Sequence, residues 1–538
     1  MEDYDYIVIG AGSAGCVMAE RLGADPRRRV LVLEAGGSDM RFWIKVPLGY
    51  AFTSTDARLN WDIRTAPDEG LNGRSQVWPR GRVVGGCSSI NAMAYMRGLP
   101  GDFDDWGRAG AQGWTWDAVR ATYDAIETHE DRDDRGRAHR RGTGPVWVSD
   151  LRRDMHPFSR QFLAAAEQSG WPVLDDLNAG RGEGLGYYRS SVRHGRRWSA
   201  ADAFLRPALA RGNVHLATHA MVQRIVIEDG EARGVAYDHA GQTRIARARR
   251  GVILSAGSVN SPQILQLSGI GPGALLQSLG IPVHNDLPQV GQGLQDHLTI
   301  TYSFAAHPRT LNNTLGVTLW RLTSGMQYLA TRRGPLSVPV NQVGGYLAST
   351  PGGPPDTQIF CNPIVYTPRP TGAPQVGRAP GYILSAQPCR PTSRGEIRIR
   401  SPRPSDRPDI LPHSLSTDHD RAAAIRAGRL LQRLARSAAL TSARREALGP
   451  DVMTMDDNAL LEDFRDRSTT VYHPSCTCRM GDSPVNSVVD ARLRVHGLGR
   501  LRVVDASAFP NITSGNTNAP TMMLAARAAQ MIIEDDRR

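Results

Sequence analysis

A short apolar run that leads directly into a glycine-rich turn is the sequence feature that most constrains the fold. Residues 6–9 (YIVI) are typical of a buried strand, and residues 10–15 (GAGSAG) follow them without a gap. A helical pattern comes next, and residues 29–33 (RVLVL) predict a second strand that ends at Glu34. This order, within about 30 residues, predicts a β-α-β unit of the dinucleotide-binding type.

The glycines of this turn have separate tasks. Gly10 allows the tight turn out of the strand, Gly12 lets the backbone approach a pyrophosphate, and Gly15 lets the helix pack close to the strand. The helix N-terminus, with Ser13 and Ala14 beside the turn, offers free N–H groups and a partial positive charge to phosphates. We therefore expect the turn to hold the pyrophosphate of a dinucleotide.

Glu34 stands where a dinucleotide site needs an acid, at the end of the second strand and about 20 residues after the turn. Its carboxylate suits acceptance of hydrogen bonds from ribose hydroxyls and would repel a 2′-phosphate, which disfavours NADP. Glu34 and Ala35 belong to the expected cofactor-binding set. The unit predicts an ADP-containing cofactor and leaves the choice between FAD and NAD open.

The composition is typical of a soluble globular protein of two to four domains. Hydrophobic residues make up 40% and charged residues 22% of the 538 residues, which argues against a mostly disordered chain. No stretch approaches the roughly 20 apolar residues that span a bilayer. Residues 1–8 (MEDYDYIV) lack the basic and apolar regions of a secretory signal. We therefore expect a cytoplasmic protein.

The net charge of +11 does not by itself indicate nucleic acid. Lys45 is the only lysine among 64 cationic residues, the arginines are scattered among acids, and no basic arm or RNA-binding motif is present. The six cysteines form no Cys-x-x-Cys motif and have no zinc spacing with histidines. The sequence predicts reduced thiols, no metal site and no nucleic-acid partner.

Similar short strands recur far apart in the chain. Residues 251–257 and 501–506 resemble the first strand, which predicts one parallel sheet assembled from separated segments. Residues 300–400 alternate in polarity between Pro/Gly-rich stretches and suit an antiparallel sheet with long loops. Residues 418–449 and 518–535 predict helices, the second with Pro520 in its first turn.

Several further segments resemble the signatures of the glucose–methanol–choline (GMC) flavoprotein oxidoreductases. They are residues 78–91 (WPRGRVVGGCSSIN), 257–271 (GSVNSPQILQLSGIG), 290–297 (VGQGLQDH), 472–481 (YHPSCTCRMG), 505–510 (DASAFP) and 514–521 (SGNTNAPT). Together with the β-α-β unit they cover nearly the whole chain. Within the family the chain looks most like bacterial choline dehydrogenases and related FAD-dependent alcohol dehydrogenases.

The resemblance implies an α/β fold (α+β overall). A Rossmann-like FAD-binding domain would be assembled from discontinuous segments, and a substrate domain would hold an antiparallel sheet flanked by helices. The expected divisions are a first FAD-binding segment at 1–155, a connecting segment at the domain boundary at 156–214, a second FAD-binding segment at 215–300, the substrate domain at 301–462, and a third FAD-binding segment with the catalytic pair at 463–538.

The cofactor implied by the resemblance is noncovalent FAD. Some family members carry a flavin-linked histidine just before the position of Asn91, where this chain has Ile90. The expected cofactor-binding residues are Gly10, Gly12, Ser13, Ala14, Gly15, Glu34, Ala35, Val84, Gly85, Gly86, Asn91, Ala92, Met93, Ala94, Val222, Ala256, Gly257, Asp505, Ala506, Asn516, Thr517, Asn518 and Thr521.

The resemblance also implies a catalytic pair, His473 and Asn516. An alcohol carbon releases hydride only as its hydroxyl proton is lost or the charge is stabilised, and a histidine with an ordinary pKa of about 6.5 can take that proton near neutral pH. The amide of Asn516 could hydrogen-bond the substrate oxygen beside His473. Spacing alone does not single out either residue.

We expect FAD-dependent oxidation of a primary alcohol to an aldehyde, with hydride passing to flavin N5. A dehydrogenase is favoured over an oxidase, and a quinone, another carrier or oxygen would then reoxidise the flavin. The alternatives are a choline-specific dehydrogenase, for which no cation site can be placed, and a non-oxidative member such as a hydroxynitrile lyase or fatty acid photodecarboxylase. An NAD enzyme or a non-catalytic binding protein fits the flavin-like segments less well.

Other features stay open at the level of sequence. Residues 40–62 correspond to the family's lid over the active-site entrance, or are an ordinary surface loop. Arg193, Arg196 and Arg197 cluster on what is expected to be a solvated face, with a substrate or partner contact as the alternative. Peripheral contact with a quinone-bearing inner membrane is compatible with the sequence, and the oligomeric state is not legible.

Overall fold

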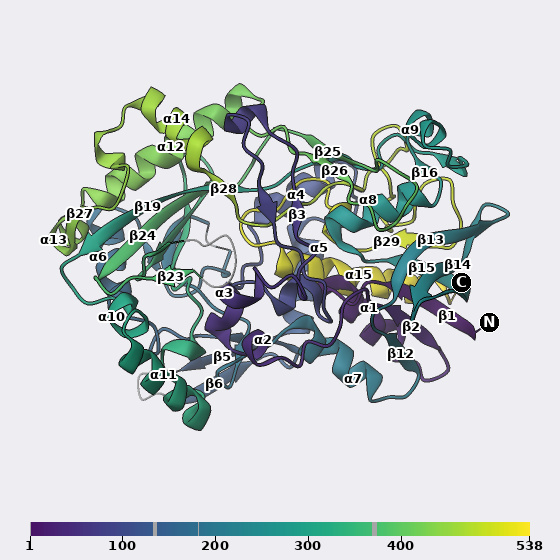
Figure 1. Ribbon diagram of the computed structural model, residues 1–538, viewed down its shortest axis with the longest axis horizontal. Coiled ribbons are helices and arrows are strands. Elements are labelled where there is room, and N and C mark those ends of the chain that lie inside the picture. The colour runs from purple at the N-terminus through teal and green to yellow at the C-terminus, as the bar shows by residue number, and fades with distance from the viewer. Residues whose placement is uncertain (1, 133–136, 181, 368–373, 538) are drawn as a thin grey trace.

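The computed structural model describes residues 2–132, 137–180, 182–367 and 374–537. Two large sheets stand at opposite ends of the molecule, and both chain termini lie beside the same one (Figure 1). None of the described helices is long and apolar enough to cross a membrane.

The first sheet joins strands from distant regions of the sequence. β1 pairs in parallel with β2 and β15, β12 extends the sheet beyond β2, and β29 pairs in parallel with β15. The strands are β12 (Val214–Ala217), β2 (Val30–Leu33), β1 (Glu2–Ile9), β15 (Gln242–Leu254), β14 (Glu231–His239), β13 (Met221–Glu228) and β29 (Leu501–Val503). This confirms the predicted parallel sheet built from separated segments, and adds an antiparallel hairpin, β13–β14, that was not among the predicted elements.

Helices from both ends of the chain cover this sheet. α15 spans the predicted residues 518–535 and packs against α1, so the two chain ends share one hydrophobic core (Figure 1). The helices here are α1 (Ser13–Leu22), α4 (Pro100–Arg108), α5 (Trp116–Ile126), α7 (Arg206–Leu209), α8 (Gly257–Leu267), α9 (Gly273–Ser278) and α15 (Asn518–Asp535).

The second sheet is antiparallel apart from the pairing of β8 with β9. In order, its strands are β27 (Arg444–Ala447), β19 (Leu298–Ala306), β24 (Gly381–Pro388), β21 (Thr357–Asn362), β20 (Val343–Leu347), β9 (Gly184–Tyr187) and β8 (Val173–Leu174), and β28 (Thr469–Thr470) also pairs with β19. The helices beside it are α6 (Ser159–Gln168), α12 (Asp418–Ala435), α13 (Ala438–Ala443) and α14 (Asp457–Arg467). The predicted fold class is thereby confirmed, while the five divisions of the chain stay predictions.

The single helix expected over residues 418–449 is interrupted. α12 ends before Ser437, whose extended backbone (φ −60°, ψ 149°) begins α13, and Ser437 Oγ accepts a hydrogen bond from the backbone N–H of Leu440. A serine oxygen satisfies a free N–H group at a helix start, so this residue favours a break. The chain then leaves α13 as strand β27.

Shorter elements connect and flank the two sheets. The helices are α2 (Phe42–Lys45), α3 (Tyr50–Thr53), α10 (Leu311–Leu315) and α11 (Thr318–Thr331). The strands are β3 (Ile63–Arg64), β4 (Val77–Trp78), β5 (Glu127–Arg132), β6 (Ala138–Arg141), β7 (Val146–Ser149), β10 (Val192–Arg193), β11 (Arg196–Arg197), β16 (Ile270–Gly271), β17 (Asn285–Asp286), β18 (Gln292–Leu294), β22 (Tyr366–Thr367), β23 (Gln375–Val376), β25 (Gly395–Arg398) and β26 (Asp409–Leu411).

Candidate active site

One elongated cavity of about 680 Å³ runs from the carboxyl ends of the parallel strands to the face of the antiparallel sheet. Gly10 and Glu34 line one end, Thr301 and Phe360 line the other, and His473 lies on the wall between them. Ligands of parallel α/β sheets bind outside the carboxyl ends of the strands. The cavity therefore has a dinucleotide end and, against the second sheet, a substrate end.

Most of the predicted cofactor residues line this cavity. The exceptions are Gly15, Val84 and Gly85, which lie behind its wall. A Cβ on Gly15 would stand 1.8 Å from the carbonyl oxygen of Gly10, and the N–H of Gly85 donates to the carbonyl of Ala11 at 2.7 Å. These two glycines shape the turn rather than facing the cavity.

Two glycine-rich segments meet backbone to backbone at the dinucleotide end. Gly10 has φ +97°, and a Cβ there would stand 2.5 Å from the carbonyl oxygen of Ser255. A Cβ on Gly86 would stand 2.7 Å from the Cα of Gly12. No side chain caps the first turn of α1, so its N–H groups remain for a ligand. The shape and the open N–H groups fit a pyrophosphate.

Glu34 is buried beside this turn. Its two carboxylate oxygens accept hydrogen bonds from the backbone N–H of Ala11 (2.9 Å) and of Gly36 (2.7 Å). Burial nevertheless raises the pKa of Glu34 to about 7. Each oxygen retains a lone pair beyond the one that the backbone uses, so the carboxylate fits ribose hydroxyls.

Asp505 and Ser13 hold the dinucleotide end of the cavity together. Buried Asp505 accepts hydrogen bonds from the backbone N–H of Gly257 (2.9 Å) and from the hydroxyl of Ser261 (2.6 Å). The hydroxyl of Ser13 donates to Asn518 Oδ1 at 2.7 Å and so joins the first turn of α1 to the first turn of α15. The starts of both helices are thereby fixed at one cavity wall.

The two predicted catalytic residues meet beside the substrate end. His473 Nε2 lies 3.3 Å from Asn516 Nδ2, and both side chains line the cavity. Asn516 Oδ1 is buried and has no hydrogen-bond partner among the described residues. Behind His473 lies fully buried His297, with 3.1 Å between the two Nδ1 atoms.

A backbone carbonyl fixes the tautomers of both imidazoles. His297 Nε2 lies 2.9 Å from the carbonyl oxygen of Cys389, which can only accept, so Nε2 carries the hydrogen. Burial lowers the pKa of His297 to about 4, so the ring is neutral and its Nδ1 is an acceptor. His473 must therefore donate from its own Nδ1. Its Nε2 is left as a lone pair that faces Asn516 and the cavity.

The surroundings keep His473 neutral. Burial, with nearby His297 and Arg80, holds the pKa of His473 well below its ordinary value. The backbone N–H of His473 donates to Asp296 Oδ1 at 2.8 Å, and Arg80 donates to the carbonyl of Tyr472 at 2.8 Å. Burial raises the pKa of Asp296 to about 6. A neutral imidazole whose Nε2 lone pair faces the cavity is suited to accept a proton.

Sequence reasoning did not single out His297, although it lies in the family-like segment 290–297. It also did not single out the residues that wall the substrate end. Among these, Thr301, Phe360 and Tyr366 lie in no motif. The others include Tyr50 and Trp61 of the expected lid and Tyr472 of the family-like segment 472–481.

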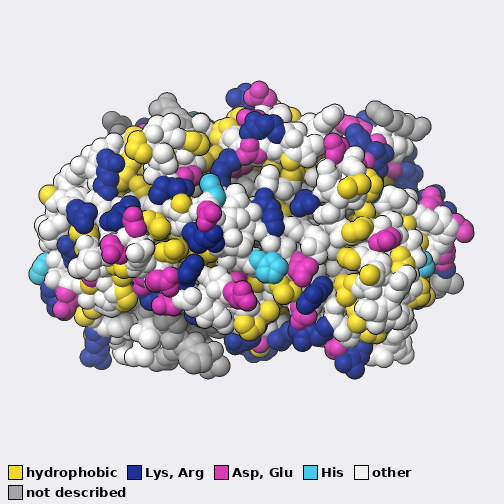
Figure 2. All heavy atoms as spheres, turned by 90° about the horizontal axis from the view of Figure 1, so that it is seen from above, with side chains coloured by type: hydrophobic (Ala, Val, Ile, Leu, Met, Phe, Trp, Pro, Cys, Tyr) yellow, Lys and Arg dark blue, Asp and Glu magenta, His cyan; other side chains and the backbone are white. Residues whose placement is uncertain are grey.

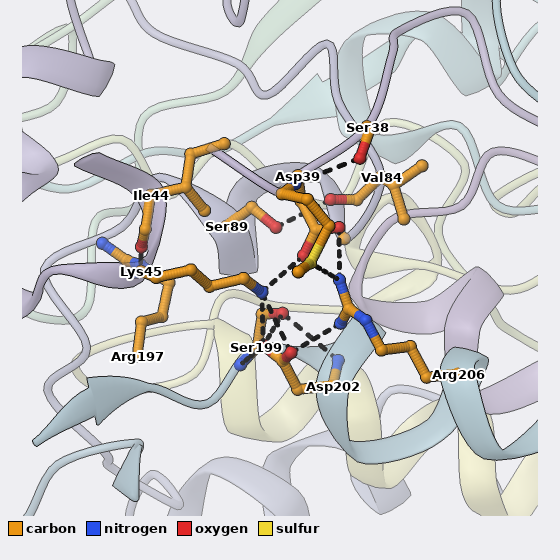
Figure 3. Close-up of polar contacts among 12 residues, drawn as sticks. Ser38, Asp39, Ile44, Lys45, Val84, Ser89, Arg197, Ser199, Asp202 and Arg206 are labelled. Atoms are coloured by element: carbon orange, nitrogen blue, oxygen red, sulfur yellow. Dashed lines mark hydrogen bonds and ion pairs between the residues drawn. The ribbon is translucent and has the colours of Figure 1, made fainter. Parts of the chain in front are cut away.

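The segment expected to act as a lid (residues 40–62) covers one side of the cavity and is anchored by a buried ion cluster. Figure 3 shows Lys45, at the end of α2, pointing between Asp39 and Asp202. Lys45 Nζ lies 2.7 Å from Asp39 Oδ2 and 2.9 Å from Asp202, and Arg206 bonds both acids at 2.5 Å (Figure 3). The only lysine of the chain thus ties this segment to the helical turn that leads into α7.

Replacing Lys45 by methionine should lower the free energy of unfolding by about 3 kcal/mol, because two largely buried carboxylates would then share one cation. Thermal unfolding measures the change. Arg58→Met, which removes an exposed ion pair with Asp56, is the matched control and should leave the unfolding temperature unchanged. Equal effects of the two substitutions would contradict a role for the cluster in anchoring the segment.

Two family models described as GMC oxidoreductase match the chain, one over residues 4–299 and the other over residues 391–525. The chain belongs to the GMC oxidoreductase family. It is 40% identical to an alcohol dehydrogenase (acceptor) of Pseudomonas putida, over 98% of this chain and 96% of the relative. It is 41% identical to human mitochondrial choline dehydrogenase, over 99% of this chain and 90% of the relative.

A solved structure agrees with the fold of this GMC oxidoreductase. An FAD-dependent oxidoreductase from Chaetomium thermophilum superimposes with a TM-score of 0.89 at 26% identity, covering 99% of this chain and 100% of that chain. The predicted enzyme class, an alcohol oxidoreductase, and the predicted cofactor, FAD, are confirmed. The glycine cradle, Glu34 and the start of α15 are the regions of this GMC oxidoreductase that fit FAD.

Proposed function

We propose that this GMC oxidoreductase oxidises a neutral primary alcohol to an aldehyde, with His473 as the base. The observation that carries the proposal is the fixed lone pair on His473 Nε2, which faces the cavity beside Asn516. When bound, FAD supplies the acceptor for the hydride that leaves the alcohol carbon. The alcohol O–H proton passes to His473 Nε2 as the carbon–oxygen double bond forms.

Asn516 has a positioning task in this scheme. Its Nδ2 can donate to the alcohol oxygen, and its unpartnered Oδ1 can accept a hydrogen bond from the hydroxyl before the proton moves. An alcohol held by Asn516 would place its oxygen next to His473 Nε2. A fixed geometry of this kind removes much of the entropic cost of reaching the reactive arrangement.

The charges around the cavity favour a neutral substrate over choline. Among the described cavity-lining residues the acids are Glu34 and Asp505, and both follow strands at the dinucleotide end. The cation near His473 is Arg80, which repels a quaternary ammonium group. Trp61 and Tyr366 offer aromatic surface, which binds apolar groups as well as cations. A medium-chain or aryl alcohol therefore fits the substrate end better.

The attachment of FAD and the electron acceptor are also proposed. Ile90, which lines the cavity, has no group that can bond covalently to the flavin, so the cofactor-binding residues of the cavity are proposed to hold FAD noncovalently. A quinone, another carrier or oxygen would take the electrons, and the P. putida relative named alcohol dehydrogenase (acceptor) favours an acceptor other than oxygen.

Anaerobic titration of the purified yellow protein tests this function. Benzyl alcohol and a medium-chain primary alcohol should each bleach the flavin absorbance, and choline should bleach it much less at equal concentration. Bleaching by choline alone would contradict the neutral-substrate proposal. A flavin that no alcohol of the panel bleaches would contradict alcohol oxidation.

The rate of flavin reduction should depend on pH through His473. Only the neutral imidazole accepts a proton, and the pKa of His473 is lowered, so the neutral form predominates at pH 7. The rate should be level there and should fall as the pH drops through a pKa below 6.5. Anaerobic stopped-flow measurements of the flavin reduction rate across this pH range check the predicted fall. A rate that rises as the pH falls would contradict the assignment of His473 as a base.

A further inference from the structure

Helix α11 presents its apolar side chains to solvent. The exposed fractions are 64% for Leu319, 51% for Trp320, 60% for Leu322, 62% for Met326 and 59% for Leu329. The residues that α11 buries are Ser324 and Tyr328. A surface helix of a globular protein normally turns its apolar stripe toward the core and its polar residues outward. In α11 this arrangement is reversed.

Four of the five exposed residues form one stripe. Leu319, Leu322, Met326 and Leu329 are spaced three or four residues apart, so they lie along one side of the helix. Contiguous apolar surface of this kind is unfavourable in water and marks an interaction site.

The lid segment also exposes apolar side chains. Met40, Phe42, Trp43 and Phe52 are exposed there. Two connections link α11 to this segment. Tyr328 donates to the carbonyl of Gly195 in the β10–β11 turn, and this hairpin packs against α2 through β11. The turn after α11 also packs against the turn after α2. Figure 1 shows α2 and α11 along the same lower side of the molecule. We call α11 and these four lid residues the α11 face.

The α11 face is bordered by positive charge. The sequence contains no Asp or Glu between Asp296 and Asp356. Exposed arginines here and in the β10–β11 turn are Arg196, Arg309, Arg321, Arg332 and Arg333. Within the described residues of the chain, none of these has a carboxylate within 4.0 Å.

The opposite side of the molecule is different. Figure 2, which looks down on the upper side of Figure 1, shows basic and acidic side chains interspersed, with small apolar areas between them. Many of the charges near α12 and β26 are paired, as in Arg421 with Asp418 and Arg400 with Asp409. On this side the apolar areas are thus interrupted by charged side chains, unlike the stripe of α11.

We infer that the α11 face binds the surface of an anionic lipid membrane. An apolar helix stripe flanked by arginines is the combination that inserts at the boundary between headgroups and acyl chains, where anionic lipids attract the cations. A second copy of this chain would bring the same unpaired arginines together, which disfavours self-association. The inference does not depend on the proposed alcohol chemistry.

Docking in this way would place the covered side of the active-site cavity next to the bilayer. Tyr50 and Ala51 of the lid segment line the cavity, while Phe42 and Trp43 of the same segment belong to the α11 face. An alcohol or electron acceptor dissolved in the lipid would then meet the enzyme on the side of the cavity that the lid segment covers. The membrane would thus act as a source of apolar reactants.

Co-sedimentation of the FAD-loaded enzyme with vesicles tests the inference. The enzyme should bind vesicles of phosphatidylcholine mixed with phosphatidylglycerol and should bind pure phosphatidylcholine vesicles much less. Raising the salt concentration should weaken the binding. Failure to bind the anionic vesicles at low salt would overturn the inference.

A double variant locates the surface. Leu322→Glu with Met326→Glu should weaken binding to the anionic vesicles at least about tenfold. Val485→Glu, which alters an exposed apolar residue outside the α11 face, is the matched control and should bind as the wild type does. Unchanged flavin absorbance and unchanged reduction by alcohol would show that the double variant is folded. Wild-type binding by that variant would overturn the assignment to this face.

Two further readouts keep the test decisive. Vesicles of brominated lipid should quench tryptophan fluorescence in the wild type, and Trp320→Phe should lose a fraction of this quenching. Light scattering without lipid should show the same mass for the wild type and the double variant. A larger mass that only the wild type shows would instead make the α11 face an interface between copies.

Discussion

Replacing His473 by alanine is expected to slow the reduction of FAD by alcohol about 10²–10⁴-fold, the usual contribution of a positioned base. The contact with His297 fixes the tautomer of His473, so that the lone pair on His473 Nε2 faces the cavity. Asn516, which lies beside it, cannot accept the proton in its place. Anaerobic stopped-flow absorbance measures the rate. The FAD content should not change, because the cradle lies at the other end of the cavity.

His307→Ala is the matched control, since His307 is exposed and lies outside the cavity. It should reduce FAD at the wild-type rate. If the His473→Ala enzyme also reduced FAD at the wild-type rate, this would contradict the assignment of His473 as the base.

Replacing His297 by leucine is the second change with a large expected effect. His473 would lose the acceptor for its Nδ1–H and could place a hydrogen on Nε2 instead, where the alcohol proton must go. A wrong imidazole tautomer costs up to about 10⁴ in rate in a serine protease triad. We expect flavin reduction to slow at least about 10²-fold. His297 acts here as a positioning residue.

His297→Asn separates positioning from packing. An asparagine Oδ1 can stand near the former Nδ1 and accept from His473, so this variant should recover much of the rate that leucine loses. Equal rates for the asparagine and leucine variants would contradict a role for His297 in fixing the tautomer of His473.

The regions of the fold whose signal lies in consecutive residues could be predicted from the sequence. The first strand, the glycine turn and Glu34 follow one another in the chain, and α15 has a continuous helical pattern from residues 518 to 535. The same holds for the strand near 501–503, because its apolar run is short and clear. The edge strand β12 has only four residues and no distinct pattern, so no local signal indicates it.

The residues of the site that lie in recognisable motifs could be predicted from the sequence. His473 and Asn516 lie in family-like segments, but the His297–His473 pair joins residues 176 positions apart, and the carbonyl that fixes it comes from a third segment. Thr301 and Phe360, on the sheet side of the substrate end, come from separate strands, and no local pattern specifies how these strands pair. Residues 300–400 were predicted to form an antiparallel sheet with long loops, so helix α11 within them was missed. Its outward apolar stripe is an exception to the usual pattern of surface helices, and the packed structure reveals it.

The central claim is that an alcohol gives hydride to FAD while His473 takes its proton. The most direct measurement compares flavin reduction by a primary alcohol with reduction by the same alcohol deuterated at its reacting carbon, anaerobically and in one stopped-flow series. We predict bleaching by both, with a slower rate for the deuterated alcohol in the wild type and a far slower rate for both in the His473→Ala enzyme. Absence of bleaching, or rates that neither deuterium nor the loss of His473 changes, would contradict the account.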